Sequence, residues 1–235
     1  MSTEIYLHKH TRREFRERMT ADELRACIIP VAAIEQHLEH MAMEHDWRSV
    51  NVIAERVARQ LSPQVIVAQG LMVGISEHHM SHPGSLSLSP GTFVTVLSDL
   101  IDSVVRAGFQ NVLVLNGHGG NIATCQAVWD QLLRKFKINL QFLPYWEVLT
   151  TDDAKLLKTQ DIPGHAQEFE TAFALAAFPG NVRLDAMANQ RDDSPTHATE
   201  VAGEQLIDRT VERVAKIVGE MISGENVIEI PPYFP

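Results

Sequence analysis

Short, continuous apolar runs alternate along this chain with longer segments in which apolar residues recur at helical spacing. The runs expected to form strands are Cys27–Ala32, Val65–Ala68, Val112–Leu115 and Asn139–Leu143. The segments expected to form helices are Val50–Leu61, Pro90–Ala107, Ile122–Phe136, His165–Phe178 and Glu200–Ile222. Strands that alternate with helices in this way predict an α/β fold, a three-layer sandwich with a mainly parallel central sheet. The length of 235 residues fits one large domain of this class, so we expect a single domain over residues 1–235.

The composition excludes several classes of protein. Hydrophobic residues make up 45% of the chain and charged residues 21%, which are values of a folded globular domain and not of a disordered chain. The formal net charge is −10 and the basic residues form no stripe, so nucleic acid is not expected as a partner. No apolar run reaches the roughly 18 to 20 residues that a membrane span needs.

The ends of the chain and its cysteines bear on location. Met1–His10 is polar and mixed in charge, without the apolar core of a signal peptide. Both cysteines, Cys27 and Cys125, lie in apolar segments and are expected to be buried, reduced thiols. We therefore expect a soluble, cytoplasmic protein. Prolines predict a non-helical tail at Ile230–Pro235, and polar residues predict a loop at Asn189–His197.

The 11 histidines are clustered. Three lie in Glu35–Asp46 and three in His78–His82, whereas His118 and His165 lie in glycine-containing turns. The first two clusters and His118 each follow a predicted strand region. Ligands of open α/β sheets bind beyond the carboxyl ends of the strands, so this placement predicts a metal site at that edge.

Glu35, His37 and Asp46 form the first group of candidate ligands. Glu35 and His37 are two residues apart, so in an extended loop their side chains point the same way. A carboxylate and an imidazole suit zinc, manganese or iron, and Asp46 could bridge two ions. The alternative is a solvated polar loop in which Asp46 caps a helix that begins near Val50.

The segment Asn116–Asn121 is a glycine-rich turn between a predicted strand and a predicted helix. Its glycines allow the backbone to approach a ligand closely, with His118 at the end of the sheet. A turn of this kind can also bind phosphate at a helix N-terminus, but neither a Walker lysine nor GxGxxG spacing is present.

Glu168 and Glu170 follow His165 in the segment 164–171. Two residues apart on a helix, the two glutamates cannot share one face, so one of them at most faces a site. The alternative for either glutamate is an acidic residue favoured by the dipole at a helix N-terminus.

Four segments together resemble the signatures of the creatininase family. Residues 35–46 are similar to EQHGPHLPLxTD, residues 76–93 to a stretch with FPGT and PETF, residues 108–121 to GF…NGHGGN, and residues 165–171 to HAGExETS. The motifs occur in order and cover roughly residues 25 to 180.

The resemblance implies an amidohydrolase with two divalent ions, zinc or manganese, a small-molecule substrate and a homohexameric assembly. By position, Glu35, Asp46 and His118 would hold one ion, and His37, Asp46 and a second carboxylate the other. In creatininase that carboxylate lies just after the NGH histidine. In this chain that position is Gly120. The alignment therefore favours Glu170, although ideal helical geometry from His165 favours Glu168.

Some residues of this chain depart from the family signature. Gly-Pro after EQH is Leu38-Glu39 here, a later proline is Ala42, and the threonine before the aspartate is His45. The phenylalanine of FPGT is His82, and the glutamate and histidine ahead of it are His78-His79. These changes leave the proposed ligands intact and alter the wall of the pocket. The extra histidines are interpreted as polar groups around the ligands.

The expected reaction is hydrolysis of a C–N bond in a small, cyclic amide by a hydroxide that bridges the two ions. His165 matches a histidine implicated in proton transfer and would protonate the leaving group. The same groups could open a ring at a C–C bond, as in a cyclic diketone derived from inositol. A metal-binding protein without catalytic activity is a further alternative.

The hexamer implied by the resemblance gives a first testable prediction. Light scattering at micromolar concentration should give about six times the 26.3 kDa mass of one chain. A mass of one chain across that concentration range would contradict the prediction.

Overall fold

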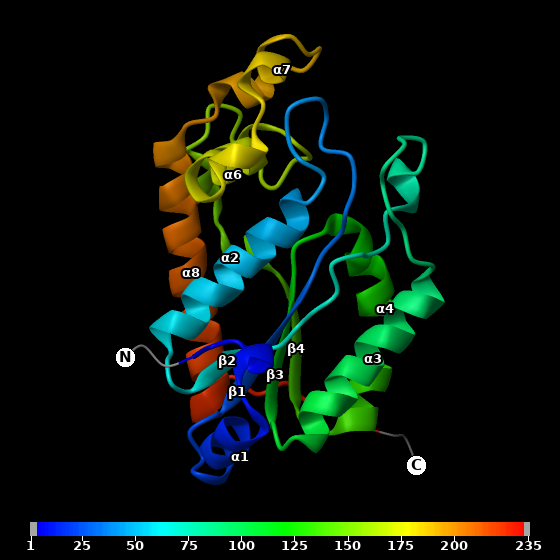
Figure 1. Cartoon of the computed structure of the whole chain (residues 1–235), viewed down its shortest axis with the longest axis vertical. Helices are drawn as coiled ribbons and strands as arrows, with labels where there is room; N and C mark the ends of the chain where they lie inside the picture. Colours follow the sequence, from blue (N-terminus) through cyan, green and yellow to red (C-terminus); the bar gives the residue numbers. More distant parts are fainter. Residues whose placement is uncertain (1–3, 233–235) are drawn as a thin grey trace.

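The computed structural model describes residues 4–232, in which four strands form one sheet (Figure 1). The strands are β1 Ala26–Val31, β2 Val65–Val67, β3 Asn111–Asn116 and β4 Asn139–Pro144. They are hydrogen-bonded in the order β2-β1-β3-β4, and every neighbouring pair is parallel. The predicted α/β sandwich around a parallel sheet is therefore confirmed.

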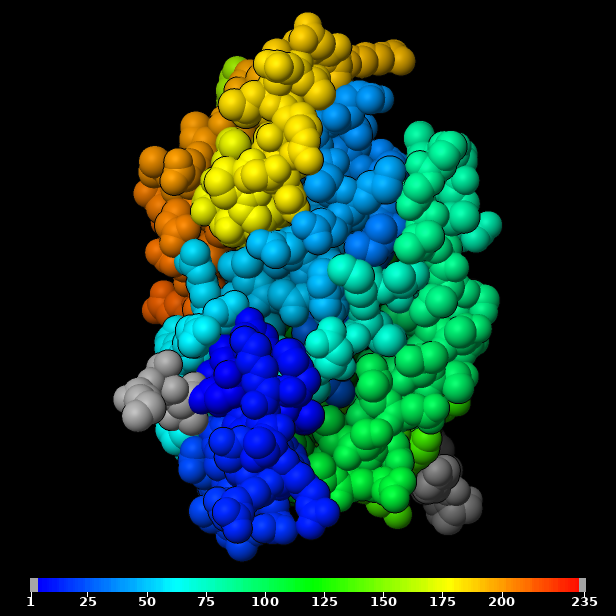
Figure 2. All heavy atoms as spheres, viewed as in Figure 1, coloured from blue at the N-terminus to red at the C-terminus, as the bar shows by residue number. Residues whose placement is uncertain are grey.

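Helices cover both faces of the sheet. The helices are α1 Arg12–Thr20, α2 His45–Gln60, α3 Pro90–Arg106, α4 Ile122–Phe136, α5 Thr151–Ala154, α6 Glu168–Ala177, α7 Leu184–Ala188 and α8 Glu200–Ser223. Short 3-10 turns are η1 Leu7–Lys9, η2 Glu77–His79, η3 Gly119–Asn121, η4 Tyr145–Val148, η5 Pro179–Asn181 and η6 Ser194–His197. In Figure 1, α2, α6 and α8 lie to one side of the strands, whereas α3 and α4 lie to the other. In Figure 2, α2 in cyan crosses the middle of the visible face between the yellow α6–α7 region and green α3.

Alternating strand residues supply the two cores. Ile28 and Leu113 pack with α2, α6 and α8, whereas Cys27 and Val112 pack with α3 and α4. Burial of a large apolar side chain contributes about 1.5–3 kcal/mol, so both layers depend on these strands. Cys27 and Cys125 are buried free thiols, as predicted. Within residues 4–232, no helix combines the length and apolar character that crossing a membrane requires.

Two predicted helices begin at other residues than expected. α2 begins at His45, whereas the predicted helix began at Val50. The prediction missed the first turn because it relied on an apolar stripe, which that turn, beginning with His45 and Asp46, does not continue. α6 begins at Glu168 and not at His165, because Ala166 has a left-handed backbone with φ of 53° that no helix accommodates. Sequence reasoning also missed α1, although Thr11 and Glu14 form a capping box at its start.

The polar segment 189–197 is a loop that ends in the short η6 turn. The described part of the predicted tail, residues 230–232, is neither helix nor strand. Residues 233–235 of that tail and residues 1–3 of the predicted polar start lie outside the described residues.

The strand order creates a crevice where β1 and β3 lie side by side. The chain leaves β1 through a loop to α2 on one face, and it leaves β3 through η3 to α4 on the other face. Loops that depart to opposite faces leave a gap at the carboxyl ends of such strands, which is where open α/β sheets bind ligands. The first and third predicted ligand segments follow these two strands.

Asp153 in α5 ties the region after β4 to helix α8. Its carboxylate is buried and accepts hydrogen bonds from Arg209 at 2.6 Å, from Arg213 and from the Thr150 backbone N–H at 2.7 Å. Arg213 also donates to the Val148 carbonyl at 2.8 Å. These contacts hold the pKa of Asp153 well below its ordinary value, although burial by itself would raise it.

We predict that Asp153→Asn lowers the free energy of unfolding at pH 7 by about 1–2 kcal/mol, because hydrogen bonds to charged groups are lost. A carboxyl whose folded pKa is depressed stabilises the fold above its unfolded pKa. The advantage of the wild type should therefore be full at pH 7 and shrink below about pH 5 as the carboxylate is protonated. Urea unfolding at several pH values measures this difference.

Asp152→Asn is the matched control, because Asp152 pairs with Lys155 on the surface, with both side chains largely exposed. The control should change the free energy of unfolding little at any pH. An equal effect of the two substitutions, or an Asp153→Asn effect that does not vary with pH, would contradict the assigned role of Asp153.

Candidate metal centre

Two candidate ligands lie in the loop between β1 and α2, and a third, Asp46, lies in the first turn of α2. Glu35 and His37 lie in a loop that turns at Leu38, where φ is 54°, and that returns to the start of α2. The Glu35 N–H donates to the Met43 carbonyl at 3.1 Å, which holds the two arms of the loop together. As a result, Glu35, His37 and Asp46 are all buried within one small volume.

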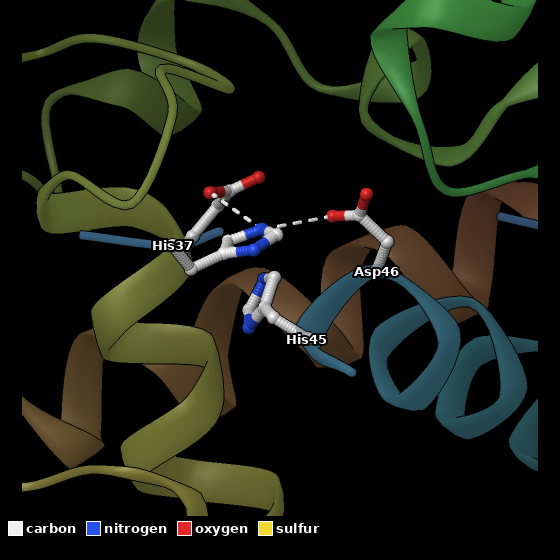
Figure 3. Close-up of side chains that lie close together, drawn as sticks. His37, His45 and Asp46 are labelled. Atoms are coloured by element: carbon white, nitrogen blue, oxygen red, sulfur yellow. Dashed lines mark hydrogen bonds and ion pairs between the residues drawn. The ribbon is translucent and has the colours of Figure 1, made fainter. Parts of the chain in front are cut away.

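His37 lies between two carboxylates. Its Nε2 is 3.1 Å from Oδ1 of Asp46 and 3.8 Å from Oε2 of Glu170 (Figure 3). Its other ring nitrogen, Nδ1, lies 3.0 Å from the carbonyl oxygen of Glu35 and can donate to it. A backbone acceptor on one nitrogen fixes the ring and leaves the other nitrogen for a ligand, as is usual for metal-binding histidines.

His118 has the same arrangement on the opposite side of Asp46. Its Nε2 lies 3.0 Å from the carbonyl oxygen of Ile75, whereas Nδ1 lies 3.0 Å from Oδ2 of Asp46 and 3.4 Å from Oε1 of Glu35. Asp46 therefore offers one oxygen to each histidine. This is the arrangement expected of a carboxylate that bridges two ions.

Glycines allow the turn after β3 to come this close. A Cβ atom at Gly117 would lie 2.7 Å from the Asp46 carbonyl oxygen. A Cβ atom at Gly120 would lie 2.1 Å from the Ile75 carbonyl oxygen and 2.5 Å from Nε2 of His118. Position 120 therefore has no room for a side chain, and a second carboxylate must come from another element.

The two glutamates of α6 point to different places. Glu170 is buried beside His37, and its Oε2 accepts the Ala166 N–H at 2.6 Å. Glu168 accepts the backbone N–H groups of Lys158 at 2.8 Å and Thr159 at 2.7 Å. Glu168 thus anchors the loop before the helix, and Glu170 is the glutamate that reaches the candidate ligands.

The electrostatics of the cluster are those of a site for cations. Burial raises the pKa of Glu170 and of Glu35. Burial would lower the pKa of His37, but Asp46 and Glu170 outweigh it and raise that pKa to about 10. The negative charge of the carboxylates thus favours the protonated form of the neighbouring imidazole. A divalent ion bound in the cluster would supply positive charge in place of that proton.

One oxygen of the cluster supports this interpretation directly. Oε2 of Glu35 is buried and has no hydrogen-bond partner among the described residues. A buried carboxylate oxygen without a partner costs about 1–3 kcal/mol or more, whereas an ion would satisfy it. Together with two oriented imidazoles, the donor set fits oxygen- and nitrogen-binding divalent metals such as zinc or manganese.

His165 lies at the open side of the cluster. Its ring stacks on that of His79 at 4.4 Å, and its Nδ1 lies 3.7 Å from Oε1 of Glu35. Gln36 contacts both rings through Nε2, at 2.8 Å for His165 and 2.9 Å for His79, while Oε1 of Gln36 accepts the Leu38 N–H. Burial, with His37 and His79 nearby, lowers the pKa of His165 to about 3, so the ring is uncharged at neutral pH.

A cavity of about 350 Å³ opens over these groups. His78, His79 and His165 contribute imidazoles to its wall, and Trp146 contributes an aromatic surface. Sequence reasoning missed Trp146 and Gln36. The available signals were the position of Trp146 just after β4 and the position of Gln36 between two proposed ligands.

The other histidines of the first two motifs differ in their surroundings. His40 is buried, with Nε2 2.9 Å from Oγ1 of Thr171 and Nδ1 3.1 Å from Nε2 of Gln190. His45 is also buried, but neither of its ring nitrogens has a hydrogen-bond partner among the described residues. His82 is exposed and bonds only locally, to Ser81.

Comparisons with known proteins show which sequences and structures this chain resembles. The family profile described as creatininase, creatinine amidohydrolase, matches residues 8–218. Creatinine amidohydrolase of Pseudomonas putida is 28% identical over 202 residues, which cover 79% of this chain and 76% of that protein. The 3-dehydro-scyllo-inosose hydrolase of Thermotoga maritima is also 28% identical, over 75% of this chain and 57% of that protein.

Solved structures share the fold. A crystal structure of creatinine amidohydrolase superposes with a TM-score of 0.82, covers 93% of this chain and 98% of that chain, and is 23% identical in sequence. Related solved structures include a creatininase variant of the Zn-Zn type and a manganese creatininase.

The different surroundings of the two glutamates give a testable prediction. Glu170→Gln should lower the affinity for one of two bound ions. The decrease should exceed the roughly 10–100-fold loss of affinity that follows removal of an outer-sphere partner. Glu168→Gln is the matched control in the same helical turn and should retain both ions. Mass spectrometry of metal content after dialysis measures the difference. Loss of an ion from Glu168→Gln alone would contradict the assignment of Glu170.

Proposed function

This chain belongs to the creatininase family, whose members are hydrolases, and on that premise we propose that it cleaves a C–N bond of a small, cyclic amide with two divalent ions. Glu35, Asp46 and His118 would hold one ion, and His37, Asp46 and Glu170 the other. The observation that carries this proposal is the placement of both imidazoles on opposite oxygens of one buried aspartate, at 3.1 and 3.0 Å.

The two proposed ions are zinc, manganese or one of each, as in the solved creatininases of the Zn-Zn and manganese types. When bound, two such ions lower the pKa of a water molecule and polarise a carbonyl group. The residues around them determine what binds and where protons move.

The cavity wall indicates the class of substrate. The cavity has a volume of about 350 Å³, which suits a small molecule. No lysine or arginine of residues 4–232 contributes to its lining. An acidic substrate would therefore find no cationic side chain there. Imidazoles and the face of Trp146 suit an uncharged or polar ring with hydrogen-bonding groups.

His165 is the proposed proton-transfer residue. It lines the cavity beside the candidate ligands, where it would take a proton from the attacking water and deliver it to the leaving nitrogen. Its stacking on His79 and its contact with Gln36 hold the ring at the rim of the ligand cluster. The ring therefore adjoins the proposed ions without being needed to hold them.

Hydrolytic opening of a cyclic diketone at a C–C bond is the second candidate. It is favoured by the inosose hydrolase, which is 28% identical over 186 residues, compared with 28% over 202 residues for the creatinine amidohydrolase. A polar wall of imidazoles would also suit a polyhydroxylated ring. A panel of cyclic amides, formamides and cyclic diketones, tested with the zinc- and manganese-loaded protein, distinguishes the two reactions. Turnover of none of these compounds would contradict the proposed function.

We predict that His165→Ala retains both ions and lowers kcat roughly 10²–10⁴-fold on the best substrate of that panel, which is the usual range for a lost acid–base residue. His82→Ala is the control, because His82 is exposed and does not line the cavity. Metal analysis and steady-state kinetics measure the two effects. If His165→Ala loses metal along with activity, His165 is a ligand and not a proton-transfer residue.

A further inference from the structure

His45 is a buried imidazole whose polar atoms have no protein partner. The residue is 1% exposed, and neither Nδ1 nor Nε2 forms a hydrogen bond within the described residues. A neutral imidazole always carries one N–H donor and one acceptor, so both are unsatisfied. Leaving such groups buried and unpaired costs about 1–3 kcal/mol for each, so this position needs an explanation.

The surroundings of His45 show where a partner could be. Its ring lies 5.0 Å from that of His37 (Figure 3). It also lies 6.3 Å from the ring of Phe173 and 5.7 Å from the ring of Phe178. One nitrogen of His45 belongs to a set with ligand atoms of His37, Asp46 and Glu170, all within 4.8 Å of one another. The aromatic side offers no hydrogen-bonding atom, and the other side offers the candidate metal centre.

We propose that His45 is a fourth protein ligand of the ion held by His37, Asp46 and Glu170. The inference rests on the proposed function only in requiring that this ion is bound. Ligand atoms about 2.0–2.2 Å from one ion are at most about 4.4 Å apart, so the four atoms need to close by a few tenths of an ångström. The creatininase signature has threonine at this position, so the ligand is a feature of this chain and is absent from the family pattern.

The cavity supports a division of roles between the two ions. Glu35, Asp46, His118 and Glu170 line the cavity, whereas neither His37 nor His45 does. The ion bound by His37 and His45 would therefore lie below the cavity floor with four protein ligands, which is the closed arrangement of a retained metal. The ion bound by Glu35 and His118 would face the cavity with three protein ligands and keep an open position.

The ligand types indicate which metal each position prefers. Two imidazoles and two carboxylates favour zinc-like ions below the floor, whereas two carboxylates and one imidazole make the cavity-facing position more suitable for manganese. The position below the floor should also exchange its ion more slowly, because it has four protein ligands and two of them, His37 and His45, lie outside the cavity lining.

Metal retention tests the proposal without any substrate. The zinc-loaded wild type should lose one ion quickly to a chelator and the other slowly. His45→Thr, which restores the residue of the family signature, should release the slow ion about 10–100-fold faster or more, since even loss of an outer-sphere partner has that effect. His40→Thr is the matched control, because His40 is equally buried but both of its nitrogens have protein partners.

X-ray absorption at the zinc edge provides a second measurement that does not depend on release rates. The zinc-loaded His45→Thr protein should show one imidazole fewer per pair of ions than the wild type, and His40→Thr should show no change. Unaltered release of the slow ion together with an unaltered imidazole count in His45→Thr would overturn the proposal and leave the proposed function intact. A wild type that binds no zinc and no manganese would overturn both.

Discussion

Three buried carboxylates, on Glu35, Asp46 and Glu170, impose the constraint on which the rest of this structure depends. An isolated carboxylate cannot remain charged away from water, so each of these groups needs a nearby cation or proton. His37 and His118 are oriented toward the carboxylates by backbone carbonyls on their far sides. These contacts fix the orientation of both imidazoles, and Oε2 of Glu35 has no hydrogen-bond partner among the described residues.

The fold provides this cluster through the order of its strands. β1 and β3 are neighbours in the sheet but not in the chain, and the segments after them carry Glu35, His37 and His118. Asp46 then comes from the start of α2 and Glu170 from the start of α6, two helices on the same face of the sheet. Candidate ligands from four segments thus meet in one buried cluster.

The polar residues of the candidate site occupy the first turns of two helices, α2 and α6. α2 begins with His45 and Asp46, and α6 begins with two buried glutamates, where an ordinary surface helix would expose its polar first turn. The left-handed backbone at Ala166 is part of the same adaptation, because its N–H donates to Glu170 and fixes that carboxylate. The candidate site is thus built on departures from simple helical patterns at the two helix starts.

The sequence by itself determined the class of fold, the parallel sheet and the segments that contribute to the site, because apolar periodicity and motif order are local properties of the chain. It also indicated that Glu170 or Glu168, but not both, could face the site. The alignment favoured Glu170, but only the tertiary structure shows which of the two side chains lies beside His37, since the left-handed turn at Ala166 sets where α6 begins and hence where each side chain points. The contacts of Gln36, the wall formed by Trp146 and the isolation of His45 depend on residues distant in the chain, which no local pattern specifies.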